Sequence, residues 1–319
     1  MRKALAIGGV LLAAAAVWVW SVVAVWFAPL SELPWTLQID PQTGTWHTEN
    51  PGSELDALQR ALDLRGWTAR PGLYVFEGGL TGGAVAQRVA SGERETVRVV
   101  VPAHREIGVI ASSIAGQIWA DSASVDAALR VDSMWWQIRP NTYDFYWEAS
   151  AQSVAQRLVR ESNAWWTPER RQQAAAWGLR PDEAVTLASI VQEETASSME
   201  APRVAGLYLN RLRRGMLLQA DPTLKFALGD WERRRLLDAD KDVDSPYNTY
   251  RNAGLPPGPI RIPESSYVEA VLKAETHAYL YMCARADRTG EHAFARTYSE
   301  HLRNARAYQN MLSRNGIYR

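Results

Sequence analysis

The stretch PDEAVTLASIVQEETA, residues 181–196, sets the character of the longer part of the chain. It opens with a proline and two acidic residues, which favour the first turn of a helix. At about 100° per residue, Leu187 lies about 20° and Ile190 about 40° from Glu194 around the predicted helix. Glu194 therefore falls in the middle of the apolar stripe. Glu193 falls about 100° away, so we expect its side chain to point to the side of the helix or to solvent.

A carboxyl group on a buried apolar face loses hydration, which disfavours its charged form and raises its pKa. A raised pKa prepares a carboxyl group to act as a general acid near neutral pH, so Glu194 is the candidate catalytic residue. The helical geometry leaves a second interpretation open, in which Glu194 forms an ordinary ion pair with an arginine such as Arg203 or Arg211.

Three segments rich in polar and turn-forming residues follow this helix. They are Leu218–Thr223, Ser245–Tyr250 and Gly254–Ile260. Rigid loops that carry amide, hydroxyl and ring groups suit sugar recognition, so we expect these segments to surround Glu194. The candidate substrate-binding residues are Gln219, Asp221, Asn248 and Tyr250. The sequence leaves two structural alternatives open: Asp221 could cap a helix that begins at Pro222, and a tyrosine such as Tyr250 is common in cores.

The periodicity divides the chain into four parts. Residues 1–31 are predicted to be a cytoplasmic tip and a transmembrane anchor. Residues 32–53 are predicted to be a linker because they are rich in Pro, Gly and Thr. Residues 54–149 alternate helical and β-branched patterns, which predicts a small α/β module with a connecting segment. Residues 150–319 are predicted to be a helix-rich mixed α/β domain, beginning with a helix to Trp165 and a second one capped by Thr167. The predicted fold class is therefore α+β.

The N-terminus carries a candidate membrane anchor. Arg2 and Lys3 precede residues 4–31, which contain no charged side chain. About 20 apolar residues are enough to span a bilayer as a helix, and tryptophans in the distal half suit a membrane interface. We therefore expect a single-pass anchor in the cell (inner) membrane, with a cytoplasmic N-terminus. The positively charged start places the rest of the chain on the periplasmic or extracytoplasmic side.

Composition excludes several classes of function. The 35 basic and 35 acidic residues give a net charge of zero, so nucleic acid is not an expected partner. The one cysteine, Cys283, excludes an intramolecular disulfide framework and every site with several cysteine ligands. The five histidines form no HExxH pair, and the chain has no Gly-x-Ser-x-Gly elbow and no P-loop. We therefore expect no metal and no cofactor.

Four ordered blocks resemble the signature blocks of the MltG (YceG-like) endolytic murein transglycosylases. The blocks are LASIVQEETA, RVAGLYLNRLRRGMLLQADPT, SPYNTYRNAGLPPGPI and the AYLYMCARADRTGEHAFARTYSEH region, between Leu187 and His301. Upstream, residues 139–143 resemble the family's Phe-Pro-Asp-Thr-Tyr block, and residues 70–118 are similar to its LysM-like module. Three positions depart from the family pattern: Asn141 replaces an Asp, Ala220 replaces a Ser or Thr, and Gln192 stands where Glu is frequent. The last departure leaves Glu194 as the residue that matches the family's catalytic glutamate.

The resemblance implies a carbon–oxygen lyase that cleaves the β-1,4 bond between MurNAc and GlcNAc within glycan strands of peptidoglycan. The product would carry a 1,6-anhydro-MurNAc end, and cleavage would terminate nascent strands. Glu194 alone could then serve as acid and afterwards as base, since the sugar's own 6-hydroxyl is the nucleophile. Peptidoglycan strands are the implied substrate, and cell-wall synthases are candidate protein partners.

Two alternatives come from other functional classes. A membrane-anchored protein that binds peptidoglycan for assembly would keep the small module and the polar loops without using Glu194. A hydrolytic glycosidase, a muramidase, would need a second carboxylate about 5 to 9 Å from Glu194, for which the sequence offers Asp221 and Glu193.

Overall fold

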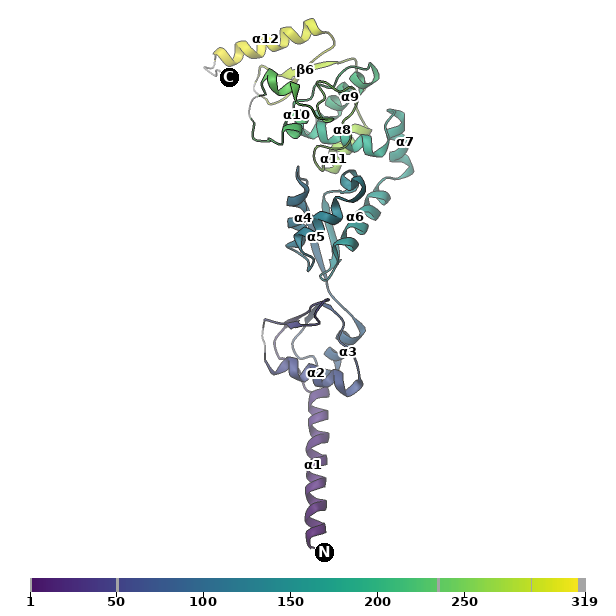
Figure 1. Ribbon diagram of the computed structural model, residues 1–319, viewed down its shortest axis with the longest axis vertical. Helices are drawn as coiled ribbons and strands as arrows, with labels where there is room; N and C mark the ends of the chain where they lie inside the picture. Colours follow the sequence, from purple (N-terminus) through teal and green to yellow (C-terminus); the bar gives the residue numbers. More distant parts are fainter. Residues whose placement is uncertain (1, 50–51, 234–235, 288, 315–319) are drawn as a thin grey trace. The chain divides into compact units, whose positions relative to one another are not determined.

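The computed structural model describes residues 2–49, 52–233, 236–287 and 289–314 (Figure 1). It is a mixed α+β structure that divides into two units. The first unit comprises Met1–Val99, Ala115–Asp121 and Tyr143–Ser150. The second comprises Val100–Ile114, Ser122–Thr142 and Ala151–Arg319. The second unit thus draws on residues upstream of position 150, where the sequence predicted its beginning.

The first unit contains a small antiparallel sheet with strand order β2-β1-β3. Its elements are α1 (Arg2–Phe27), β1 (Trp35–Ile39), β2 (Trp46–His47), α2 (Ser53–Arg65), β3 (Gly72–Phe76) and α3 (Gly82–Ser91). Trp35 pairs with Phe76 and Ile39 with Gly72, so β1 lies between its two partners. The segment 32–53, predicted to be a linker, therefore supplies the central strand. Alternate side chains of β1 enter the core, a two-residue period that the flanking Pro and Gly concealed.

The end of α1 packs against this module. Trp26 and Trp67 have ring centroids 5.9 Å apart, and the Arg65 guanidinium lies 4.9 Å from the Trp26 ring. A Cβ atom on Gly83 would lie 2.6 Å from the Trp26 ring, so the close approach of α3 to α1 requires glycine there. The N–H of Leu30 donates to the carbonyl of Leu80. These contacts join α1 to the module without a flexible connection.

The predicted membrane anchor covers residues 1–31, and the side chains of residues 1–11 lie outside the described ones. Among the side chains that are described, no helix combines the length and the hydropathy that a membrane crossing requires.

The second unit is mainly helical. Its helices are α4 (Ile107–Ala115), α5 (Ser122–Leu129), η1 (Val131–Gln137), α6 (Ala151–Trp165), α7 (Pro168–Ala176), α8 (Pro181–Glu194), α9 (Ala201–Arg213), α10 (Asp221–Leu228), η2 (Asp238–Asp242), α11 (Ser265–Leu272) and α12 (Tyr298–Arg314). Strands β4 (Thr96–Val101) and β5 (Asn141–Tyr146) form a two-stranded sheet, through which the division between the units passes. Strands β6 (Tyr281–Ala284) and β7 (His292–Ala295) form an antiparallel hairpin.

Local signals place several helices where the sequence predicted them. The Thr167 hydroxyl accepts a hydrogen bond from the N–H of Arg170, and Pro168 occupies the first turn of α7. The cap at Thr167 was predicted from the sequence and is confirmed, and the proline that follows it suits the first turn of a helix.

Helix α8 is the central helix of the second core. It packs against α9 and α11, and these helices lie together with α10 in Figure 1. Leu187, Ile190 and Val191 are fully buried in the core of this unit. The Ser189 hydroxyl accepts a hydrogen bond of 3.0 Å from the N–H of Ile260, which fastens the end of the proline-rich loop to α8. The core therefore fixes both the helix that carries Glu194 and one of the loops beside it.

Candidate active site

Glu194 is the last residue of α8. The helix ends there because Thr195 adopts an extended conformation, with φ −137° and ψ 133°. Glu194 is half-buried and opens onto a cavity of about 330 Å³. The cavity is lined by residues of α8, α9, α10, α12, the β6–β7 hairpin and two loops, one before α10 and one between η2 and α11: Glu194, Leu207, Tyr208, Arg211, Leu218, Gln219, Asp221, Tyr250, Met282, Cys283, Ala284, His292 and His301.

The surroundings of Glu194 hold its carboxyl group in a protonatable state. Burial raises the pKa of Glu194 to about 7, and the negative charge of Asp221 adds to this rise. The hydroxyl of Tyr208 donates to Oε1 over 2.8 Å and opposes the rise, as do the charge of Arg211 and that of His292 when its ring is protonated. Near neutral pH the group can therefore exist both as an acid and as a carboxylate, which is what one group that acts as acid and then as base requires.

The arginines considered as ion-pair partners of Glu194 have other roles. Arg211 is buried, and its guanidinium donates to the carbonyls of Leu280 and Leu218, each over 2.7 Å. Arg203 pairs with Glu275 over 2.9 Å. Arg211 therefore contributes a positive charge to the cavity wall while its hydrogen bonds hold the chain segments around it.

Asp221 and Tyr250, two of the candidates from the polar segments, lie together in the cavity of Glu194. The Tyr250 hydroxyl donates to Oδ1 of Asp221, and both residues line the cavity. Burial is the largest cause of a raised pKa of Tyr250, and its bond to Asp221 raises that pKa further. Asp221 begins α10 but does not cap it, because the N-cap residue is Ala220. Its carboxylate is thus available to the cavity.

Gln219 lies on the rim of the same cavity in an unusual backbone conformation. Its φ is 49°, in the left-handed region that residues other than Gly rarely adopt. The strain is maintained by neighbours, because its N–H donates to the carbonyl of Thr249 and the N–H of Ala220 donates to the Thr249 hydroxyl. Ala220 is fully buried beside these bonds. Strained backbone of this kind is frequent at ligand-binding sites.

Asn248 is the one candidate residue that does not line this cavity. It has no exposed surface, and its amide donates to the carbonyls of Lys241 and Val243 over 2.8 and 2.9 Å. Its Oδ1 accepts from the N–H of Tyr250 over 3.0 Å. The side-chain amide of Asn248, which was expected to recognise a sugar, therefore forms its hydrogen bonds within the protein. Asn248 acts on the cavity only by holding the Tyr250 backbone.

Glu193 also differs from the prediction, which pointed its side chain to the side of the helix or to solvent. The Glu193 side chain is 6% exposed. Its carboxylate accepts a bidentate pair of hydrogen bonds from the Arg105 guanidinium, over 2.8 and 2.7 Å. Arg261 donates to the same carboxylate over 2.7 Å. Helical projection identified only the face toward α9 and α11, whereas Glu193 is buried by residues far away in the sequence.

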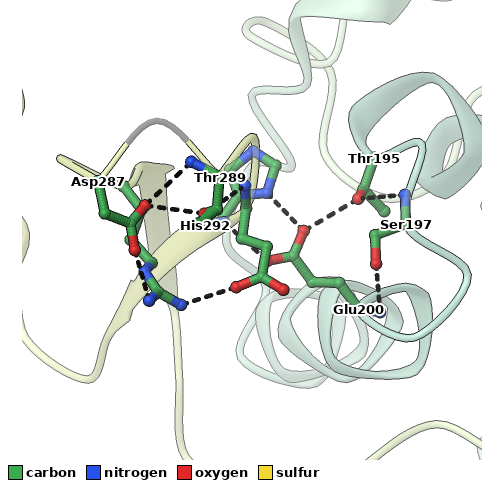
Figure 2. A network of polar contacts seen from close by, with 8 residues as sticks. Thr195, Ser197, Glu200, Asp287, Thr289 and His292 are labelled. Atoms are coloured by element: carbon green, nitrogen blue, oxygen red, sulfur yellow. Dashed lines mark hydrogen bonds and ion pairs between the residues drawn. The ribbon is translucent and has the colours of Figure 1, made fainter.

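The sequence did not single out Tyr208 or His292. Tyr208 follows Glu194 by 14 residues and lies on the apolar face of α9, where it resembles an ordinary core residue. His292 lies on β7, in the last of the matched blocks. Its ring Nδ1 lies 2.8 Å from Oε2 of Glu200. Figure 2 draws this contact as a dashed line. A histidine inside a matched block was the one signal that could have marked it. Within the described residues, no group of three His, Cys, Asp or Glu side chains is arranged to hold a metal ion.

Comparisons with known proteins relate the chain to one family. The family model described as the YceG-like family matches residues 50–307. The chain is 32% identical over 170 residues to an endolytic murein transglycosylase of Bacillus subtilis (strain 168), a match that covers 53% of this chain and 46% of that protein. It is also 32% identical over 136 residues to an endolytic murein transglycosylase of Streptococcus pneumoniae serotype 2 (strain D39), covering 41% of this chain and 24% of that protein. These matches therefore span less than half the length of either relative.

A solved structure shares the fold. A crystal structure of a yceG-like protein from Listeria monocytogenes has a TM-score of 0.56 and 23% sequence identity to this chain. The alignment covers 86% of this chain and 99% of the Listeria chain.

Proposed function

The chain belongs to the YceG-like family, and from this premise we propose that it is an endolytic lytic transglycosylase of peptidoglycan. The proposed reaction cleaves the β-1,4 bond between MurNAc and GlcNAc within a strand and leaves a 1,6-anhydro-MurNAc end. The observation that carries the proposal is Glu194, a carboxyl group with a pKa of about 7 in a cavity with Asp221 and Tyr250. The similarity to proteins named endolytic murein transglycosylase supports it.

The proposed reaction uses one carboxyl group twice, first as an acid and then as a base. Glu194 gives its proton to the bridging oxygen as the bond from the anomeric carbon to that oxygen breaks. The 6-hydroxyl of the same MurNAc then attacks the anomeric carbon, and the Glu194 carboxylate takes the hydroxyl proton. Glu194 ends the cycle protonated, so no second carboxylate and no external base is consumed. The hydroxyl of Tyr208 would orient the carboxyl through the 2.8 Å bond to Oε1.

A hydrolytic outcome is the second candidate, because Asp221 shares the cavity with Glu194. A second carboxylate could activate a water molecule or act as a nucleophile, as in other glycosidases. Glu193 does not fit the role of the second carboxylate, because its carboxylate is bound by Arg105 and Arg261.

Mass analysis of the products distinguishes the two outcomes. Purified glycan strands incubated with the protein are expected to give fragments with 1,6-anhydro ends, each lighter by one water than the corresponding hydrolysed fragment. Fragments with reducing ends alone would identify a hydrolase and contradict the lyase proposal. Strands that bind but remain intact would indicate the non-catalytic assembly protein instead.

We further propose that residues 1–31 anchor the protein in the cell membrane, with the remaining chain outside the cytoplasm. The support is the positively charged start followed by an uncharged apolar segment. The enzyme would then act on strands close to the membrane, where cell-wall synthases are candidate partners and the module that resembles LysM could hold a strand. A reporter enzyme that is active only after export, fused after Leu33, is expected to be active. Activity of a cytoplasm-specific reporter at that position would contradict the anchor and its orientation.

A further inference from the structure

A hydrogen-bonded pair of side chains, the buried Glu200 and the partly buried His292, lies beside the proposed catalytic residue. Glu200 stands just before α9 and is 6% exposed. Its carboxyl group accepts three hydrogen bonds, two of which reach Oε2. Oε2 accepts from the Thr195 hydroxyl over 2.9 Å and from Nδ1 of the His292 ring over 2.8 Å. Oε1 accepts from the backbone N–H of His292 over 2.7 Å. Figure 2 shows this network.

These bonds determine which ring nitrogen of His292 carries the proton. Burial by itself would raise the pKa of Glu200, but the bonds from His292 and Thr195 outweigh burial and lower it. Glu200 is therefore a carboxylate at neutral pH, and a carboxylate only accepts hydrogen bonds. Nδ1 of His292 must then be the donor, so in the neutral ring Nε2 is an acceptor. Within the described part of the chain Nε2 has no hydrogen-bond partner.

The position of the ring is fixed from two sides. Thr195, which holds Glu200, directly follows Glu194 in the chain, so the pair is tied to the end of α8. His292 itself lies on strand β7, where the N–H of Arg285 on the paired side donates to Glu291 and the Arg285 guanidinium donates to the Glu291 carboxylate over 2.7 Å. A ring held in this way presents one defined atom to its surroundings.

His292 lines the same cavity as Glu194. The other polar groups there include both donors and acceptors. Arg211 offers positive N–H groups, and the Tyr208 and Tyr250 hydroxyls spend their protons on Glu194 and Asp221. An amino sugar carries several O–H donors and an amide N–H, which need acceptors when they leave water. A neutral imidazole nitrogen suits this need without adding a second negative charge beside Glu194.

We propose that His292 is a second substrate-contacting residue of this site, whose Nε2 accepts a hydrogen bond from a hydroxyl or amide N–H of the amino sugar, and that Glu200 is the positioning residue that keeps this nitrogen an acceptor. The inference rests on the proposed function, because it assumes an amino-sugar substrate in the cavity.

Two substitutions at position 292 separate contact from scaffolding. In His292→Asn the amide nitrogen takes the place of Nδ1, so the bond to Glu200 is kept while Nε2 is lost. In His292→Gln the amide lies near the place of Nε2, and the bond to Glu200 is lost instead. Loss of one matched bond to a buried donor costs about 1 to 3 kcal/mol, so we expect His292→Asn to lower kcat/KM on glycan strands about 5- to 150-fold. Its thermal midpoint should stay near that of the wild type.

Glu200→Gln tests the positioning role with almost no change in size. The amide oxygen can accept from the His292 N–H, which leaves the NH₂ group facing Nδ1. The ring proton then moves to Nε2, and the acceptor in the cavity becomes a donor. We expect ¹⁵N NMR of the histidine rings to show the Nδ1–H tautomer of His292 in the wild type and the Nε2–H tautomer in Glu200→Gln. The kcat/KM should fall in parallel, as for His292→Asn.

The control is His47→Asn, which changes an exposed histidine of the first unit and should keep wild-type kcat/KM. Wild-type kcat/KM in His292→Asn would overturn the inference, and so would a changed tautomer in Glu200→Gln with unchanged kcat/KM. Both results leave the proposed function standing, since they require an active wild type. A wild type that forms no cleavage product would instead remove the proposed function, and the inference with it.

Discussion

Glu194→Gln is expected to abolish cleavage of glycan strands while the protein still folds and still binds them. The amide keeps the size of the side chain and can accept the hydrogen bond from Tyr208, but it cannot give a proton to the bridging oxygen or take one from the 6-hydroxyl. General acid–base catalysis contributes typically about 10²- to 10⁴-fold, so the rate should fall at least by that factor. The measurement is the rate of product formation by mass spectrometry, with binding measured separately on the same strands.

The pH dependence of the wild type gives a second readout of the same group. Burial raises the pKa of Glu194 to about 7, so the protonated form that starts the reaction predominates below this value and is lost above it. The rate should therefore decline as the pH rises through about 7. A rate that rises across this range would show that the reaction does not start from protonated Glu194.

The matched control is Glu161→Gln on α6, where the carboxyl group forms a half-exposed pair with Arg157 four residues away. Such pairs contribute about 0.3 to 0.5 kcal/mol, so this variant should be fully active. Full activity of Glu194→Gln would refute the mechanism together with the assignment of the catalytic residue.

Glu193→Gln is expected to lower the free energy of unfolding strongly. Its carboxylate binds Arg105 and Arg261, and the Arg261 side chain is only 14% exposed. Removing the negative charge leaves guanidinium groups without their counterion, and breaking a buried pair in this way costs about 3 to 5 kcal/mol. Arg105 is 41% exposed and can turn to water, so we expect the lower end, about 3 kcal/mol. Urea unfolding of the full chain measures the change.

Glu275→Gln provides the comparison, because Glu275 and Arg203 form an ion pair in which both side chains are more than 40% exposed. The change there should stay below about 1 kcal/mol. Equal stability changes in Glu193→Gln and Glu275→Gln would show that the three-residue cluster around Glu193 does not stabilise the fold. Activity per folded molecule of Glu193→Gln should remain close to the wild type.

The sequence by itself determined the features that depend on neighbouring residues. The helix at 181–194 follows from its acidic first turn and apolar period, and the place of Glu194 on that stripe follows from about 100° per residue. The cap at Thr167 follows from the chemistry of one side chain and the next proline. Ordered blocks of sequence also indicated the family and brought Asp221 and Tyr250 forward as candidates.

Only the tertiary structure decided the partners of these residues. Glu193 meets Arg105 from 88 residues away, and His292 meets Glu200 from 92 residues away. Asn248, expected in the cavity, donates instead to the carbonyls of Lys241 and Val243. Strand β1 is central because β2 and β3 pair with its two edges. A period in the sequence encodes which face of an element is apolar, since that depends on local backbone geometry. Which partner a charged or amide group meets depends on how segments far apart in the sequence pack together. That packing depends on all of these segments at once, so no single segment of sequence reveals it.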